Sequence, residues 1–553
     1  MTAAHLIRKT FAGILALTLA SVVLPGGNGL NAADQGAEDL RKGKAFYAIE
    51  DYQSAAMSFS LAAQDGIAEA QYLLGKCYQD GKGVKKDAMR GLSYFRKAAE
   101  QGYAPAQFEL GTYYAFAEED QEEAESWFKK AVAGLRPAAN RGDADAQQLL
   151  GFCYDCGFGV AQDASEAVKW YRKAADQGHA EAQFDLATCY KNGEGVKQSD
   201  VEASKWYRKA ADQGHMKAQY LYALSVSLGK AGNKDDVEAA KWFRKAAEQG
   251  YAKAQYSIGF DYLAGRGVKQ DAAEAVKWFA KAADQDHAGA QCMLGKCYQA
   301  GNGVRQNDVE AAKWFRKAAE QGDADAQQLL GRCYENGKGV EQDDDEAVKW
   351  FRKSADQGDA DGQFNLGFAY LMGQGSLKKD PDEAVKWFRK AAEQDHVGAQ
   401  FLLADCYKDG NGVRQNDVEA VKWYRKAADQ DYPAAMCMLG LMSEFGRGVK
   451  EDPVEAVKWY RKAAAMGHPK AQYLLGLCYR DATGVEEDPV EAVKWYRKAA
   501  EQGYPEAQCV LGLCLATGKG TEQDLSEAMD WLRKAADQGD EDAMKAIEII
   551  EGD

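Results

Sequence analysis

The chain has 553 residues, with 69 Lys and Arg against 85 Asp and Glu, so its formal net charge is −16. A protein this acidic is a poor binder of nucleic acid or anionic lipid, and we expect neither as a partner. Length alone suggests about three or four domains, but a repeat that runs through most of the sequence overrides that expectation.

Residues 1–33 have the features of a secretory signal peptide. Arg8 and Lys9 precede an apolar run from Phe11 to Leu24, and small residues follow. A basic start, a short apolar centre and small residues at the cut are typical of export signals. The run is shorter than the ~20 residues of a membrane span. We expect a periplasmic or secreted chain that is not inserted in the membrane after cleavage; an uncleaved N-terminal anchor is the alternative.

Residues 34–69 predict a helix–turn–helix that lacks the tryptophan and the glycine-rich loop of the later units. Residues 543–553 begin the pattern of one more helix and then stop. A stacked array needs both of its ends covered, so we interpret these two segments as its caps.

Residues 70–542 consist of thirteen units of one repeat. The pattern starts again at Ala70, Ala106, Ala146, Ala182, Ala218, Ala254, Ala290, Ala326, Gly362, Ala399, Ala435, Ala471 and Ala507. Eleven of the twelve intervals are 36 or 37 residues, and one is 40. A fixed period in this range is the signature of a stacked repeat array.

Each unit predicts two helices. In the unit that starts at Ala182, which we number position 1, the nearly constant positions 1, 2, 5, 6, 8 and 9 fall on one side of a helix. Gly193 and Gly195 end this first helix, because glycine accepts the left-handed conformation. Ser199 and Glu202 then form a capping box that starts the second helix. The corresponding pairs elsewhere are Asp163/Glu166, Asp235/Glu238, Asp271/Glu274, Asn307/Glu310, Asp343/Glu346 and Asp452/Glu455.

All twelve tryptophans occupy one position of the second helix. They are Trp127, Trp170, Trp206, Trp242, Trp278, Trp314, Trp350, Trp387, Trp423, Trp459, Trp495 and Trp531. Ligand stacking is one interpretation, but an aromatic ring flanked by alanines more often packs between helices, so we predict a structural role. The opposite face carries Lys205, Arg208, Lys209 and Asp212, which are typical of a solvated stripe.

The run AQxxLGxxYxxGxGVxxDxxEAxKWYRKAAxQG resembles the Sel1-like repeat, a relative of the tetratricopeptide repeat. The resemblance implies an all-α fold, a right-handed α-solenoid of helix–turn–helix units, and a plain tetratricopeptide-like unit at residues 34–69. Members of this family mostly act as adaptors and scaffolds, some exported bacterial members interact with host proteins, and a few cysteine-rich members have been linked to penicillin binding. The Ala106 unit lacks the GxGV loop and the Ala218 unit reads GKAGN there, so we expect the superhelix to bend or loosen at these units.

No set of residues with catalytic or metal-binding spacing stands out. Five histidines occupy the turn between units and His5 lies in the signal segment. Eight of the twelve cysteines share position 8 of the first helix, which suggests small buried side chains, although disulfides are permitted in an exported chain. Cys153 and Cys156 form a lone CxxC without a thioredoxin-like context. We predict no catalytic residue, no cofactor and no metal.

Positions 3, 7 and 10 of the first helix lie within about 60° of one another, opposite the constant face. If first helices line the concave side of the solenoid, this variable stripe is the binding groove. Residues assigned to it are Phe184, Thr188, Lys191, Tyr256, Phe260, Leu263, Lys296, Gln299, Phe364, Phe368 and Leu371. Packing of position 3 between units is the alternative, so positions 7 and 10 are the better candidates.

The sequence therefore favours an exported, non-enzymatic scaffold that binds a protein or peptide along its concave face. A hydrolase acting on β-lactams or cell wall, and a passive envelope spacer, are the alternatives.

Overall fold

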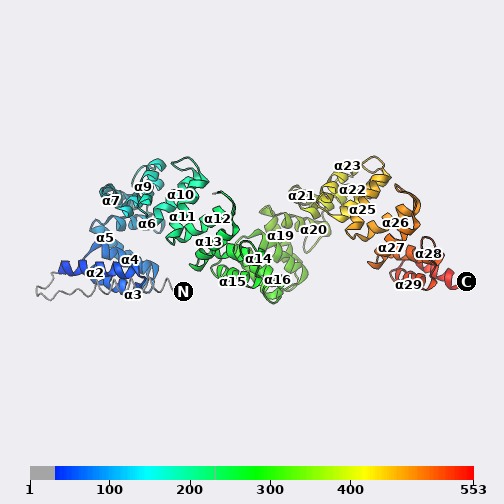
Figure 1. Ribbon diagram of the computed structural model, residues 1–553, viewed down its shortest axis with the longest axis horizontal. Helices are drawn as coiled ribbons and strands as arrows, with labels where there is room; N and C mark the ends of the chain where they lie inside the picture. The colour runs from blue at the N-terminus through cyan, green and yellow to red at the C-terminus, as the bar shows by residue number, and fades with distance from the viewer. Residues whose placement is uncertain (1–31, 231, 553) are drawn as a thin grey trace. The chain divides into compact units, whose positions relative to one another are not determined.

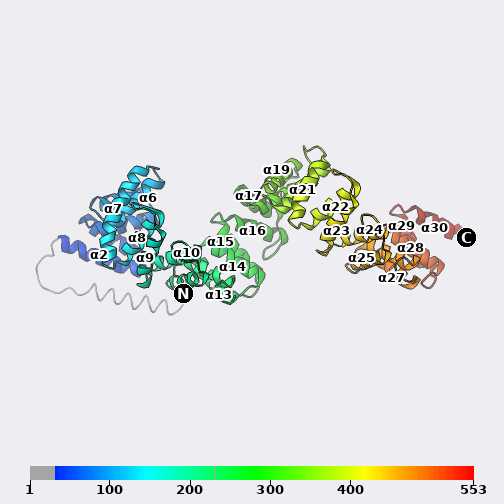
Figure 2. The same cartoon turned by 90° about the horizontal axis from the view of Figure 1, so that it is seen from above.

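The computed structural model describes residues 32–230 and 232–552 (Figures 1 and 2). These residues form 29 helices and no strand, so the predicted all-α solenoid of repeats is confirmed. The predicted signal peptide falls almost entirely on residues 1–31, which lie outside the described residues.

Every repeat consists of two helices joined by a loop. The first helices are α4 (Ala68–Asp80), α6 (Ala104–Phe116), α8 (Ala144–Cys156), α10 (Ala180–Asn192), α12 (Met216–Ser227), α14 (Ala252–Ala264), α16 (Ala288–Ala300), α18 (Ala324–Asn336), α20 (Ala360–Met372), α22 (Val397–Asp409), α24 (Pro433–Glu444), α26 (Pro469–Asp481) and α28 (Pro505–Thr517). The second helices are α5 (Ala88–Glu100), α7 (Gln121–Asn140), α9 (Ala164–Asp176), α11 (Asp200–Asp212), α13 (Asp236–Glu248), α15 (Ala272–Ala283), α17 (Asp308–Glu320), α19 (Asp344–Asp356), α21 (Pro381–Glu393), α23 (Asp417–Ala428), α25 (Pro453–Ala465), α27 (Pro489–Glu501) and α29 (Leu525–Ala536). Helices α2 (Ala32–Ala48) and α3 (Tyr52–Gln64) precede these units, and α30 (Glu541–Gly552) follows them.

The chain divides into two compact halves, Met1–Asp271 and Ala272–Asp553. The repeat pattern runs through this boundary without a change, so the sequence alone predicts one continuous array. The unit that starts at Ala254 contributes α14 to the first half and α15 to the second. Because each repeat packs chiefly on its neighbours, a long array has no common core that would hold it as one body.

Each repeat buries a small set of side chains. In the Ala182 unit, Ala182, Leu186 and Ala187 are fully buried and Cys189 is nearly so. The small residue at position 6 permits close helix packing, as expected: a Cβ on Gly331 would lie 2.6 Å from the ring of Phe351. Because these contacts recur in every unit, the core is a row of similar clusters.

Two glutamines hold most of the repeats together, and the sequence pattern did not reveal their role. Gln183 at position 2 is buried, and its Nε2 donates to the carbonyl of Ala175 in the preceding second helix at 3.0 Å. Its Oε1 accepts from Nε2 of Gln213, at the end of its own second helix, at 2.8 Å. We call this arrangement the glutamine bridge. It satisfies polar groups that burial would otherwise leave without partners.

Of the two hydrogen bonds expected in each capping box, the structure has the first and replaces the second. The Asp163 carboxylate accepts from the backbone N–H of Glu166 at 3.0 Å, as expected of an N-cap. The backbone N–H of Asp163, however, donates to the carbonyl of Tyr154 in the first helix. The Glu166 side chain instead pairs with Lys169 at 2.8 Å. The first helix thus supplies the bond that the glutamate was expected to make, because the two helices meet at this turn.

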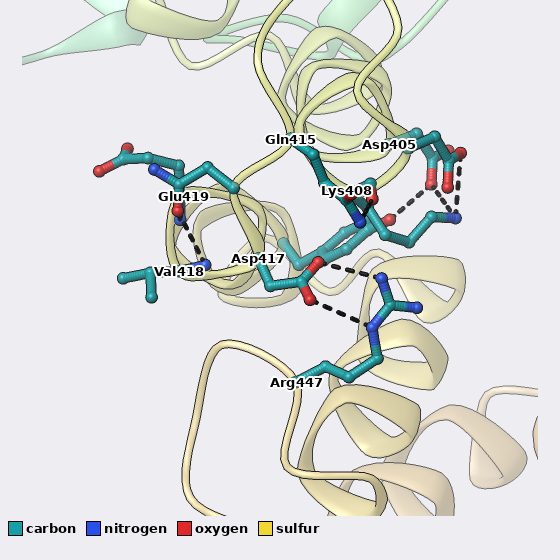
Figure 3. Close-up of polar contacts among 10 residues, drawn as sticks. Asp405, Lys408, Gln415, Asp417, Val418, Glu419 and Arg447 are labelled. Atoms are coloured by element: carbon teal, nitrogen blue, oxygen red, sulfur yellow. Dashed lines mark hydrogen bonds and ion pairs between the residues drawn. The ribbon is translucent and has the colours of Figure 1, made fainter.

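In the ordinary unit, the loop between the two helices lies on the start of the preceding second helix. Figure 3 shows one such contact: the Arg447 guanidinium, in the loop after α24, bonds both carboxylate oxygens of Asp417, at 3.2 and 3.1 Å, in the first turn of α23. In the loop after α22, Val413 packs on the cluster that contains Val385 and Phe388 of α21. We call this segment the covering loop, because it closes one end of its predecessor.

Among covering loops of ordinary length, the first glycine is replaced once, by Ala482, which has φ +57°. A left-handed alanine is strained by ~1–2 kcal/mol, partly offset by the higher entropy of glycine in the unfolded chain. We therefore expect Ala482→Gly to raise the free energy of local opening of α26 by about 0.5–1 kcal/mol. Hydrogen exchange of α26 peptides measures this change. Ala465→Gly, in the last turn of α25, should have the opposite sign for α25 peptides, and equal effects of the two changes would contradict the argument.

Candidate functional site

The first helices of neighbouring units lie side by side and form one face in each half, which we call the first-helix face. Polar contacts link them: Gln148 of α8 donates to Asp185 of α10 at 2.7 Å, and Lys76 of α4 pairs with Glu109 of α6 at 3.2 Å. In the second half, α18 also contacts α20 directly. This face carries the variable positions predicted to bind a partner.

At position 3, the side chains pack between units. The Phe184 ring stacks on His215 at the following turn, with ring centroids 4.7 Å apart, and lies 5.8 Å from Tyr207 of its own second helix. Phe364 repeats this arrangement with His396, at 4.6 Å, and Phe388, at 6.0 Å. Packing between units, the alternative that the sequence left open for position 3, therefore describes Phe184 and Phe364. Tyr256 is half-buried at the same position.

At positions 7 and 10 the side chains differ in exposure. Phe260 and Phe368 are 36% and 38% exposed, so they present apolar surface to solvent. Leu263, Leu371 and Gln299 are half-buried, and Lys191 is exposed.

The remaining predicted residues have partners within the repeat array. The Thr188 hydroxyl lies 3.1 Å from the Tyr207 hydroxyl. Lys296 pairs with Asp325 of the next first helix at 2.5 Å. The predicted residues divide between the two halves. Those of the first half lie on α10 and α14, and those of the second half lie on α16 and α20, so one first helix stands between the two groups in each half.

Two carboxyl groups, one half-buried and one buried, alter the electrostatics of the first half. Burial raises the pKa of Asp185 to about 7, although Gln148 donates to its carboxylate. Asp261 is 6% exposed, and burial raises its pKa to about 6, opposed by Arg266 at 3.1 Å. The Arg266 guanidinium also lies 5.0 Å from the centre of the Phe260 ring. An aromatic ring and a cation therefore stand together on the exposed part of this face.

The tryptophans are buried or half-buried within the second helices. Trp206 is 8% exposed, and Lys209 Nζ lies 3.6 Å from the centre of its ring. The same lysine–tryptophan contact, three residues apart, occurs at all twelve tryptophans. Lys209 is exposed, as expected of the solvated stripe, and its charge is in addition attracted to the ring face.

The inter-unit histidines cap the first helices. Nδ1 of His179 accepts from the backbone N–H of Ala182 at 3.1 Å, and its Nε2 lies 2.9 Å from Asp145 of the preceding unit. Four further histidines, His215, His287, His396 and His468, cap in the same way. Aspartates such as Asp143 and Asp323 do so elsewhere. The constant spacing of three residues before position 1 was the sequence signal for this role.

The twelve cysteines are free thiols, and ten of them are buried. Burial raises the pKa of Cys153 to about 12 and also raises that of Cys156, so neither member of the CxxC pair favours the reactive thiolate. Within residues 32–230 and 232–552, His, Cys, Asp and Glu side chains do not gather into a group that would hold a metal ion. None of the helices described here is long and apolar enough to span a bilayer.

Two pockets lie where the covering loop departs from its pattern, and they occupy equivalent positions. The first, of about 180 Å³, is lined by Gln79, Ala88, Met89, Leu92, Phe95, Glu109, Thr112 and Tyr113. The second, of about 40 Å³, is lined by Lys191, Asp200, Ala203, Ser204, Tyr207, Leu221, Leu224, Ser225, Leu228 and Lys230. The departures that the sequence marked at the Ala106 and Ala218 units thus uncover the preceding second helix.

Comparison with known proteins identifies the repeat. The Sel1 repeat family matches residues 68–103, 104–134, 144–179, 180–215, 217–251, 252–287, 288–323, 324–359, 360–396, 397–432, 433–468, 469–504 and 505–540. A search of curated proteins found no match.

Two solved structures show the same likeness. The protective antigen of uropathogenic Escherichia coli strains, which displays an SLR fold, is 37% identical; the alignment covers 76% of this chain and 90% of the antigen, with a TM-score of 0.65. A Sel1 repeat protein of Oxalobacter formigenes is 34% identical over 56% of this chain and 89% of its own, with a TM-score of 0.44. Sel1 repeat proteins are typically protein-interaction scaffolds and typically not enzymes. The thirteen matched segments span most of the sequence, and this chain therefore belongs to the Sel1 repeat family.

Proposed function

We propose that this protein is an exported, non-enzymatic scaffold that binds a protein or peptide partner through the first-helix face. The observation that carries the proposal is the exposure of aromatic side chains at position 7, Phe260 in the first half and Phe368 in the second. Aromatic residues are favoured anchors of protein interfaces, and first helices in solenoids present extended binding surfaces.

The surroundings of these two rings suit a binding role. Phe260 lies beside Arg266, and aromatic and arginine side chains are both enriched in interface cores. The rings are carried by helices that the glutamine bridges and caps hold in place, so little order has to be gained on binding.

Export is supported by the basic and apolar pattern of residues 1–33. The partner would then be an envelope protein or a host protein. Determination of the N-terminal residue of the protein recovered from periplasm and culture medium tests this part of the proposal. A chain that keeps residues 1–33 and stays in the cytoplasm would contradict it.

Crosslinking capture tests the binding face. The protein is used as bait in envelope and culture extracts, beside a variant with Phe260→Ser, Phe368→Ser and Leu371→Ser. We expect the variant to lose a partner that the unchanged protein retains, because the exposed apolar anchors are gone.

A matched variant controls for the general loss of apolar surface. Val418, Val454 and Val490 are 52%, 54% and 54% exposed on the second helices, and their replacement by serine should leave capture unchanged. A partner that depends on these valines but not on Phe260 and Phe368 would place the site elsewhere. Failure to capture any protein would argue against the scaffold itself.

A further inference from the structure

We propose that the 180 Å³ pocket between α4, α5 and α6 binds a glycine turn of a partner protein that carries an aliphatic side chain, in the manner of the array's own Gly-x-Gly-Val loops. We call it the edge pocket. Gln79 and Thr112, at positions 10 and 7 of their first helices, line it together with residues of α5. The proposed function makes no use of second helices, so the inference goes beyond it.

The array itself shows what fits such a site. In the ordinary unit, the covering loop places a valine against the preceding second helix, as Val413 does against Val385 and Phe388 of α21. Its second glycine lies on the first turn of that helix: a Cβ on Gly412 would be 2.1 Å from the Pro381 carbonyl oxygen. Small, glycine-bearing backbone followed by an aliphatic side chain is therefore the occupant with matching shape.

The loop that should cover α5 is too short to do so. Helices α6 and α7 are joined by residues 117–120, whereas α22 and α23 are joined by residues 410–416. The core cluster formed by Phe95, Ala98 and Leu110 includes no loop valine. Leu92 and Phe95 of α5, at the positions that Val385 and Phe388 hold in α21, line the pocket instead. The surface on which a loop valine packs elsewhere thus remains open here.

A hydrogen-bond acceptor is also left over in this pocket. At position 10 of the Ala326 unit, Glu335 accepts from Nε2 of Gln374 in the following covering loop at 3.1 Å. The equivalent residue here is Gln79, whose Oε1 is buried and has no hydrogen-bond partner. A peptide turn supplies what is missing, because its backbone N–H groups are donors. An apolar wall with one unsatisfied acceptor favours a peptide over a purely apolar ligand.

A cyclised peptide tests the proposal. Its sequence, Asp-Gly-Asn-Gly-Val-Arg-Gln-Asn, is that of residues 409–416, and a fluorescent label reports binding to the full chain. We expect saturable binding, and about tenfold or weaker affinity for a peptide with serine in place of the valine. Gln79→Leu should weaken binding about threefold to tenfold, because the acceptor is lost. Gln198→Leu, an exposed residue outside the pocket, should leave it unchanged.

A loop graft distinguishes this pocket from every other surface. Replacing residues 117–120 with the sequence of residues 410–416 restores a covering loop from the chain itself, so the variant should fold and lose peptide binding. A seven-residue Gly-Ser linker at the same place should retain it. Absence of binding to the unchanged protein, or undiminished binding to the grafted protein, overturns the proposal. Neither result depends on Phe260 or Phe368, so the proposed scaffold function is judged separately.

Discussion

Gly412→Ala is expected to lower the free energy of local opening around α21 to α23 by about 2–5 kcal/mol, whereas Gly410→Ala, two residues earlier, should cost about 1–2 kcal/mol. Both glycines have positive φ, +71° and +70°, so both alanines bear the same left-handed strain. Only the Cβ of residue 412 would collide with the backbone of another unit, 2.1 Å from the Pro381 carbonyl oxygen. The Cβ of residue 410 would meet Gln415 Cβ at 3.3 Å.

The sequence contains a natural parallel to this pair. Among the loops of ordinary length, alanine occurs once at the first glycine, as Ala482, and the loop keeps its left-handed geometry there. At the second glycine the one alanine, Ala231, falls in the unit whose loop departs from the pattern, and it lies outside the described residues.

Hydrogen exchange resolved by peptide is the suitable measurement, because repeat arrays need not unfold in one step. Peptides of α21, α22 and α23 report the local change, and those of α28 serve as an internal reference. Equal effects of the two substitutions would show that the contact with Pro381 does not restrain the loop.

Gln400→Glu is expected to lower the free energy of local opening of α22 by about 3–5 kcal/mol at pH 7. Gln400 is fully buried. Its Nε2 donates to the Ala392 carbonyl at 3.2 Å and lies 3.4 Å from the Asp395 carboxylate. A glutamate at residue 400 would place a carboxylate oxygen against the Ala392 carbonyl and the Asp395 carboxylate, which are both acceptors. Only the hydrogen bond donated by Gln430 would be kept.

The pH dependence identifies the cause. Burial and the acceptors around residue 400 raise the folded-state pKa of the new carboxyl above its unfolded value. The folded state then binds more protons than the unfolded state between these two pKa values, so stability falls as the pH rises and the deficit shrinks on acidification.

Two comparisons control this experiment. Gln400→Leu removes the glutamine bridge without adding charge and should cost about 1–3 kcal/mol at every pH. Gln415→Glu places the same charge on an exposed side chain of the same unit and should have little effect. A pH-independent loss for Gln400→Glu, measured by hydrogen exchange at pH 5 and pH 7, would refute the explanation by charge.

The helices were predictable because their signals are local. Gly193 and Gly195 end α10, and Ser199 caps α11, as expected from backbone conformation and side-chain length alone. The glutamine bridge was not predicted, although Gln183 and Gln213 recur thirty residues apart in most units. Its partners come from three different helices, and a helical wheel shows only that position 2 is on the buried side.

The candidate site divides in a similar way. Position 3 lies at the margin of the variable stripe. Whether its side chain packs between units depends on the ring at the next turn, as His215 stacks on Phe184. Exposure at position 7 followed from the wheel, as Phe260 and Phe368 show. The edge pocket could not be predicted from the helical wheel, because it depends on how far the loop of one unit extends over the helix of another.

The covering loop gives the array a direction. Each unit supplies the piece that completes the unit before it, so a chain emerging from the ribosome always carries one unfinished unit at its growing end. After insertion or loss of a whole repeat, every remaining loop still packs on a preceding second helix. The number of repeats can therefore change during evolution. The shortened connection after Phe116 interrupts this succession and keeps the unit before it open in the finished protein.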